Sequence, residues 1–583
     1  MAAPLLGRLL DRLARRELPV WYSPAYRLPL SGTDVSLGVQ SRRADRALWW
    51  LLESRAIRPA DVHEPVAISY DELRRVHTVE LLESLESATT LAGIFAADPS
   101  GIGIDEVLST VRLACGGTLA ASRMALKRRG PTLNLLGGFH HAARDAAGRF
   151  CPVNDVAVAL AALRAETFDS RVVVLDLAAH PPDGLAACLR EDAATWIGSI
   201  SGSDREPLPG IDETVLPEGA GDELYLATLT TLLERMPKPA LAFVLAGGDV
   251  LAGDRSGRLG LTLEGARRRD LKVARALEGV PSVWVPAGGY HLDSWRVLAG
   301  TGMALASGST RPIPRGYDPL TARFARISRE LRPDDISETE ITNADVEDAL
   351  GLASQRTGNR LFLGYYTPAG VEHALIRFGA LPFLRRLGYG WFRVLIDSPG
   401  LGERLRIFGQ AKGNEHLLAE LVVEFQRLAG EKVLYVHWLT MRNPIAHFSP
   451  ARPRLPGQEV PGLGLSRELS EMLALMARRL DCAAVVIRPA HYHMAYGARR
   501  QLAFVDPSRQ GRFEALIRDL SGIPLLEATE AVSRGQVLLD GKPYLWEADE
   551  MALWLGPRDE TGRAEAITRE RERCRFALSV DRT

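Results

Sequence analysis

In the first half of the chain, the apolar residues gather in four short runs that are hydrophobic at almost every position. Each run ends in glycine or a polar cluster, as expected for strands buried on both faces of a parallel sheet. Helical patterns such as residues 155–165 and 264–277 lie between the runs. The alternation predicts repeated βα units and therefore an α/β fold. The predicted strands are residues 132–138, 172–177, 241–248 and 282–289.

The pattern changes in the second half, after a proline- and arginine-marked stretch at residues 311–315. Consecutive strand-like runs are followed there by an amphipathic helix and a further strand, which indicates an α+β domain. We therefore expect an N-terminal helix (1–19), a first domain (20–310), a linker or helix (311–341) and an α+β domain (342–583). The predicted strands of that domain are residues 391–397, 404–408, 420–425, 432–439 and 483–487, with the helix inside 456–480.

Length and composition narrow the class of protein. A chain of 583 residues exceeds the size of one hydrophobic core, and 46% hydrophobic with 25% charged residues is an ordinary globular balance. The formal net charge is −1, and positive and negative residues are mixed along the chain. The sequence therefore shows no basic segment of the kind that binds nucleic acid. No apolar run reaches the roughly eighteen residues of a membrane helix. The arginine-interleaved apolar spacing of residues 1–18 leaves open a targeting or membrane-surface helix beside a simple packed helix.

The five cysteines are scattered without a CxxC pair, which argues against a disulfide framework or a structural zinc finger. We expect a protein of the reducing cytoplasm with no membrane or nucleic-acid partner. The excess of arginine over lysine and the abundance of alanine are typical of a GC-rich bacterial genome. The sequence makes no prediction of oligomeric state.

Polar clusters follow directly after the four predicted strands of the first half. In parallel sheets ligands bind beyond the carboxyl ends of the strands, so these clusters are where chemistry is expected. The clusters are GGFHHA at residues 137–142, DLAAHPPDG at 176–184, GGDVLAGD at 247–254 and GGY at 288–290.

This set of clusters, in this order, resembles the histone deacetylase family and is most similar to its class IV branch. The agreement extends to WYSPAY (21–26), VHT (76–78) and FCPVND (150–155), so the resemblance covers about half of the chain. It implies an arginase/deacetylase-type parallel sheet flanked by helices. It also implies hydrolysis of an acylated amine, with an acylated small molecule or an acyl-lysine protein as the partner.

The resemblance assigns roles that the chemistry of amide hydrolysis requires: an electrophile, a base and a donor to the oxyanion. His180 and Asp249 match two zinc ligands, and Tyr290 matches the oxyanion donor. Phe150 matches a wall of the acyl-lysine tunnel. The histidine pair that moves protons and the carboxylates that orient it match His140, His141, Asp176 and Asp183.

The sequence departs from the family pattern at two important positions. Ala178 stands where the family has an aspartate zinc ligand, and its methyl group cannot coordinate a metal. Catalytic zinc sites usually have three protein ligands, so zinc binding is expected to be weak or absent. Arg149 stands where a glycine normally precedes the tunnel phenylalanine. Its side chain could narrow the tunnel or change the charge of the tunnel. Two prolines, Pro181 and Pro182, also replace a more polar pair.

Three hypotheses follow from these departures. The chain is a working deacylase that binds metal weakly or recruits another ligand, a pseudoenzyme that binds an acylated group without cleaving it, or a scaffold. Asp176 and Ser199 also match positions where the family binds a structural potassium ion, although ordinary polar residues at strand ends explain them equally well.

In the second half, Gln458, Gly462 and Gly464 resemble the turn with which acetyltransferases of the GNAT type bind acetyl-CoA. The spacing departs from that pattern by one residue, and a plain glycine-capped helix is the alternative. His491 and His493 would share one face of a strand and form a metal pair, if the segment is a strand. His437, in a strand-like run, is expected in the core or a pocket wall rather than in catalysis.

Overall fold

The computed structural model describes residues 17–28, 40–96, 102–202, 206–308, 312–337, 361–448, 454–499, 501–521, 523–558 and 560–579. The chain divides into two compact units, and the division falls between Pro319 and Leu320. Most of the helix predicted for residues 1–19 lies outside the described residues. Each unit has its own sheet and is described by itself.

The first unit is built on a sheet of eight strands in the order β2-β1-β3-β8-β7-β4-β5-β6. Every neighbouring pair of strands is parallel. All residues of β4 and β7 are buried, which is why these strands are apolar at nearly every position. The strands are β1 (Val20–Trp21), β2 (Val62–His63), β3 (Pro131–Asn134), β4 (Val172–Asp176), β5 (Thr195–Ser201), β6 (Asp212–Val215), β7 (Leu241–Leu245) and β8 (Ser282–Val285).

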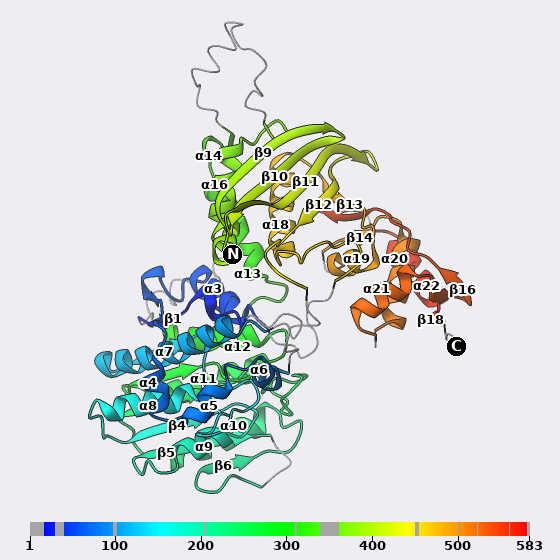
Figure 1. Cartoon of the computed structure of the whole chain (residues 1–583). Coiled ribbons are helices and arrows are strands. Elements are labelled where there is room, and N and C mark those ends of the chain that lie inside the picture. The colour runs from blue at the N-terminus through cyan, green and yellow to red at the C-terminus, as the bar shows by residue number, and fades with distance from the viewer. Residues whose placement is uncertain are drawn as a thin grey trace, which may run out of the picture. The chain divides into compact units, whose positions relative to one another are not determined.

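Helices flank this sheet, as Figure 1 shows. One group has α7 packed on α8, and in the other α10, α11, α12 and α3 pack in succession. The side chain of Asn154 accepts a hydrogen bond from Ala157 N at 3.1 Å and so fixes the start of α8. The helices are α3 (Arg43–Glu53), α4 (Tyr70–Arg74), α5 (Val79–Ser84), α6 (Ala88–Phe95), α7 (Ile104–Arg128), α8 (Asp155–Ala165), α9 (Asp183–Leu189), α10 (Asp222–Arg235), α11 (Leu263–Ala276) and α12 (Ser294–Ser307).

The four strands predicted from the apolar runs are the four consecutive strands β3, β8, β7 and β4 at the centre of the sheet. Because neighbouring strands are parallel, their carboxyl ends meet at one edge. The loops that carry the histidines, aspartates and tyrosine singled out above therefore begin side by side. The arginase/deacetylase-type sheet flanked by helices is confirmed.

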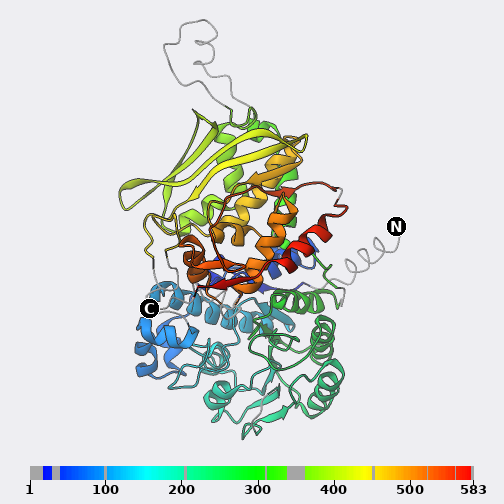
Figure 2. The same cartoon turned by 90° about the vertical axis from the view of Figure 1, so that its right-hand side faces the viewer.

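The second unit contains a seven-stranded mixed sheet in the order β14-β17-β13-β12-β11-β10-β9. Among the described strands of this sheet, β12 and β13 are the one parallel pair of neighbours, and α18 connects them. Figures 1 and 2 show β9 to β12 as long, curved strands. The strands are β9 (Gly390–Gly400), β10 (Gly402–Ala411), β11 (Asn414–Leu428), β12 (Glu431–Met441), β13 (Ala484–Ile487), β14 (Ala503–Phe504) and β17 (Met551–Trp554).

Helices cover one face of this sheet, and an apolar cavity lies between that face and α13, α16 and α18. A small antiparallel sheet of β15 (Val537–Leu539), β16 (Lys542–Tyr544) and β18 (Phe576–Leu578) completes the α+β unit that the sequence predicted. The helices are α13 (Pro319–Glu330), α14 (Asp334–Ser337), α16 (Pro368–Phe378), α17 (Ala380–Arg386), α18 (Ser466–Arg479), α19 (Tyr492–Ala498), α20 (Pro507–Asp519), α21 (Leu525–Ser533) and α22 (Arg563–Arg573).

The structure contradicts the strand on which the alternative of a metal pair at His491 and His493 depended. His491 and His493 do not share a strand face, because His491 is the N-cap of α19 and His493 lies inside that helix. The aromatic residues around them have strand propensity, but packing of Tyr492 and Ala495 into the core favours a helix. His437 does lie on a strand, β12, where its Nε2 is 2.8 Å from Glu424 Oε1. Within the described ranges, no helix is long and apolar enough to cross a membrane.

Candidate active site

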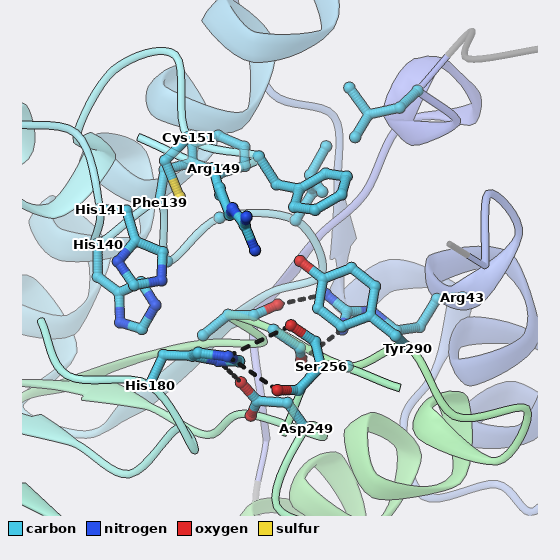
Figure 3. A pocket seen from close by; sticks show the side chains of 18 of the residues that line it. Arg43, Phe139, His140, His141, Arg149, Cys151, His180, Asp249, Ser256 and Tyr290 are labelled. Carbon is cyan, nitrogen blue, oxygen red and sulfur yellow. Dashed lines mark hydrogen bonds and ion pairs between the residues drawn. The ribbon is translucent and has the colours of Figure 1, made fainter. Parts of the chain in front are cut away.

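A cavity of about 410 Å³ lies in the first unit, at the carboxyl ends of the central strands. Figure 3 shows the histidines on one side of it and Tyr290 across from them. Two other predicted residues lie just behind the lining: Asp176 contacts His140, and Ala178 is fully buried. The predicted residues that line the cavity are His140, His141, Arg149, Phe150, His180, Asp183, Asp249 and Tyr290.

The two adjacent histidines each face a carboxylate. His140 Nδ1 lies 2.7 Å from Asp176 Oδ2, and His141 Nδ1 lies 2.7 Å from Asp183 Oδ1. The ring centroids of the two histidines are 4.2 Å apart. Both hydrogen bonds use Nδ1, so they leave each Nε2 available for another partner.

Their surroundings move the pKa values of the two histidines in opposite directions. Burial lowers the pKa of His140, but the attraction and hydrogen bond of the fully buried Asp176 outweigh it, so the pKa of His140 rises. Burial and the neighbouring charge of His140 lower the pKa of His141 despite the hydrogen bond that His141 donates to Asp183. The two shifts therefore favour the charged form of His140 and the neutral form of His141, which can accept a proton.

The raised pKa of His140 predicts a pH-dependent contribution to folding stability. The contribution is fully present below the unfolded histidine pKa of about 6.5 and is lost as the pH rises through the higher folded-state pKa. Asp176→Asn should therefore lower the free energy of unfolding by about 2 kcal/mol near pH 6 and by less at alkaline pH. Urea unfolding of both proteins across this range measures the difference. Asp183→Asn, which alters a carboxylate that is 47% exposed, is the control with a smaller loss. A pH-independent difference for Asp176→Asn would contradict the pairing.

On the floor of the cavity, His180 and Asp249 contact each other. His180 Nδ1 lies 3.0 Å from Asp249 Oδ2, and His180 Nε2 lies 3.1 Å from the carbonyl oxygen of Ser256. The second oxygen of Asp249 accepts a hydrogen bond from Ala179 N at 3.1 Å. Burial lowers the pKa of His180, but the hydrogen bond and charge of Asp249 outweigh it and raise that pKa. These two side chains are the donors that could hold a zinc ion.

The third zinc ligand of the family has no counterpart here. The Ala178 methyl group and the Asp249 carboxylate both lie next to Gly247. A β-carbon added to this glycine would be 2.7 Å from Ala178 Cβ and 2.4 Å from Asp249 Oδ1. At this place the chain offers a methyl group instead of a carboxylate. Among the residues that the structure describes, no group of three His, Cys, Asp or Glu side chains is arranged to hold a metal ion. Two donors do not fit the three-ligand zinc site typical of catalysis.

Tyr290 is held in place through its backbone. The backbone N–H groups of Tyr290 and His291 both donate to Asp254 Oδ2, at 2.7 and 2.8 Å. The Tyr290 ring packs on Phe150, with centroids 5.2 Å apart. Burial raises the pKa of the Tyr290 hydroxyl well above its usual value, so this group keeps its proton and can donate a hydrogen bond.

Sequence reasoning missed two arginines that fix the loops around the cavity. Arg43 donates to the carbonyl oxygens of Ala287 and Gly288, both at 2.7 Å. Arg269 donates to the carbonyl oxygens of Leu177 and Gly247, at 3.2 and 2.7 Å. Arg43 is far in sequence from the loop that it holds, Arg269 lies on the helix that follows the Gly247 loop, and the partners of both are backbone atoms. No residue pattern could therefore have identified them.

Asp176 and Ser199 are register partners on β4 and β5. The Ser199 side chain is fully buried, and within the described part of the chain its Oγ has no hydrogen-bond partner. The potassium site stays a prediction, and ordinary polar residues on neighbouring strands remain the alternative.

Comparisons with known proteins agree with this geometry. The model of the histone deacetylase domain matches residues 39–304. Histone deacetylase 2 of Arabidopsis thaliana is 30% identical over 299 residues, which cover 48% of this chain and 77% of that protein. An uncharacterized protein of Picosynechococcus sp. is 30% identical over 286 residues (47% and 92%), and histone deacetylase 8 of Danio rerio is 25% identical over 362 residues (56% and 92%).

The chain belongs to the histone deacetylase family, and its first unit has the deacetylase-like hydrolase fold. The match to the family domain ends at residue 304, so the second unit lies outside it. Recognition of the family from four polar clusters is confirmed.

Proposed function

We propose that the first unit binds an acylated amine, an acyl-lysine or a similar group, in this cavity and that its capacity to hydrolyse the amide is impaired. One observation carries the proposal: the cavity retains the histidine pair and Tyr290 of a deacetylase, whereas Ala178 replaces a metal ligand. Recognition of the acyl group needs the retained residues, and efficient hydrolysis needs the lost one.

Each retained side chain has a defined part in binding. The Tyr290 hydroxyl donates to the carbonyl oxygen of the acyl group, and the Phe150 ring forms an apolar wall against the alkyl chain. The neutral His141 accepts a hydrogen bond, while the charged His140 increases the positive potential at the deep end. Because the donors present do not fit the family's zinc site, no step is assigned to a metal ion.

Hydrolysis is the second candidate, because both histidine–aspartate pairs are intact. Neutral His141 can take a proton from a water molecule, and His140 can stabilise negative charge on the attacked carbonyl. A complete metal site normally supplies several kcal/mol of the charge stabilisation in such reactions. Turnover without it is expected to be slow.

Calorimetric titration with an Nε-acetyl-lysine peptide tests binding, and a hydrolysis assay with and without added zinc tests turnover. Tyr290→Phe removes one hydrogen bond and should weaken binding about fivefold, whereas Tyr70→Phe, outside the cavity lining, should leave it unchanged. Binding with little or no hydrolysis supports the main proposal. Stoichiometric zinc together with turnover that is lost in Tyr290→Phe would replace it by the second candidate. Absence of both binding and turnover would contradict both and leave a scaffold.

For the second unit, binding of acetyl-CoA stays a prediction. The turn that contains Gln458, Gly462 and Gly464 precedes α18, which follows β12 and leads to the parallel strand β13. This order of elements is compatible with the predicted ligand.

A further inference from the structure

The tip of one loop places a positive charge at the opening of the deacetylase-like cavity. Arg149 lines the cavity, and its side chain is exposed to solvent, unlike the deep His140, which is 3% exposed. Figure 3 shows the Arg149 side chain directed into the cavity. Arg149 therefore lies where the cavity meets solvent, and His140 lies at its inner end.

A short turn holds Arg149 in this position. Gly148 N donates to Cys151 O at 2.9 Å and Cys151 N donates to Gly148 O at 3.1 Å, so Arg149 and Phe150 form the two-residue tip. Phe150 N also donates to Ile94 O at 3.0 Å. The Phe150 backbone is in the left-handed region at φ 57°, which phenylalanine adopts only when its surroundings impose it. The same contacts that position the Phe150 ring therefore also fix the backbone from which the Arg149 side chain extends.

The charge of Arg149 is not compensated within the cavity lining. The lining carboxylates of Asp183 and Asp249 already face His141 and His180. Arg43, the other lining arginine, uses its guanidinium on backbone carbonyl oxygens. Within the described residues, Arg149 itself has no hydrogen-bond, ion-pair or ring partner. A planar guanidinium with free donors at the mouth of a pocket is suited to bidentate recognition of a carboxylate.

We infer that Arg149 determines ligand specificity by binding a carboxylate on the amine-bearing part of the acylated ligand. The inference rests on the proposed function, in which the acyl carbonyl reaches Tyr290 and the histidine pair. With the acyl group at the inner end, the rest of the amine extends toward the opening, where Arg149 meets it. The ligand class is an acylated amino acid with a free carboxylate, either as a small molecule or as the C-terminal residue of a peptide.

Calorimetric titration with three probes tests this assignment. The first is an Nα-blocked Nε-acetyl-lysine with a free carboxylate, the second is its carboxamide, and the third is the carboxamide with a succinyl group in place of the acetyl. We expect the wild-type protein to bind the first probe about tenfold more tightly than the second at low salt, and this preference should shrink as salt is added. Arg149→Ala should weaken binding of the first probe only, so that the variant binds the first two probes with nearly equal affinity. Arg149→Lys should keep part of the preference for the free carboxylate.

Arg144→Ala is the matched control, because it removes an exposed positive charge from the same loop but outside the cavity lining. It should retain the preference for the free carboxylate. Unchanged affinity of Arg149→Ala for the carboxamide shows that this variant is folded. Equal wild-type affinity for the first two probes overturns the role of Arg149 and leaves the proposed function intact. If the succinyl probe binds most tightly, the inference that Arg149 recognises a carboxylate on the amine-bearing part of the ligand is overturned, because the carboxylate of this probe is on the acyl group. Failure of all three probes to bind overturns the proposed function as well.

Discussion

Ala178→Asp is expected to raise the zinc affinity of the protein by at least about 100-fold. Loss of a group that only supports a metal ligand costs 10–100-fold, and a direct ligand contributes more. The wild-type protein offers His180 Nδ1 and Asp249 Oδ2, which lie 3.0 Å apart. Ala178 Cβ and Asp249 Oδ1 both lie next to Gly247. An aspartate side chain at position 178 would therefore extend from the backbone close to the Asp249 carboxylate. Zinc content after dialysis and competition with a chelator measure the gain.

The apo form of this variant should be less stable than the wild-type protein, because a third carboxylate is added close to the buried Asp176 and Asp249. Zinc should therefore raise the Tm of the variant much more than that of the wild type. Ala178→Asn is the matched control, since it has the same shape without the charge and should gain little zinc affinity. Asp249→Asn in the Ala178→Asp background should remove the gain. An Ala178→Asp protein that binds zinc no better than the wild type would show that position 178 does not reach the His180–Asp249 pair.

The apolar runs predicted the sheet well because burial on both faces leaves a local signal at every position. The four central strands of the first unit begin within one residue of the predicted runs but end one to four residues earlier, at or before the polar clusters. Helix α8 has the predicted bounds, and helix α11 is displaced by one residue. The outer strands β1, β2, β5 and β6 were not predicted. Strands β1, β2 and β6 contain two to four residues each, too few for a pattern to stand out from the neighbouring loops. Strand β5 has seven residues, but Gly198, Ser199 and Ser201 interrupt its apolar run.

The candidate site could be predicted in outline for a different reason. Its histidines, aspartates and Tyr290 follow parallel strands directly, so strand order alone brings them to one edge. The contacts that position them could not be predicted in this way. Asp254 and Arg43 act on backbone atoms of the loop that carries Tyr290, and these contacts form only when distant segments fold together. The opposite pKa shifts of His140 and His141 also depend on burial that the sequence does not encode locally.

The same limitation applies to Arg269, which stands in a run of three arginines on α11 that reads as an exposed charged face. The structure instead places Arg269 and Asp270 at 0% exposure, with Arg269 Nε 2.8 Å from Asp270 Oδ1. The hydroxyl of Thr301 donates to the other Asp270 oxygen at 2.6 Å. Through Leu177 O and Gly247 O, Arg269 connects the loops that carry Ala178 and Asp249.

Arg269→Met is expected to lower the free energy of unfolding by about 3–5 kcal/mol, because it leaves the Asp270 carboxylate buried without its partner. Urea unfolding measures the loss. Arg267→Met on the same helix is the control: Arg267 is also buried, but its partner Glu264 is 51% exposed and stays hydrated when the pair is broken, so the cost should be at most about 1 kcal/mol. Arg269→Met with Asp270→Leu should recover part of the stability, because no unpaired charge then remains buried. If Arg269→Met lost no more stability than Arg267→Met, the buried pair would not be what holds the two loops of the cavity floor.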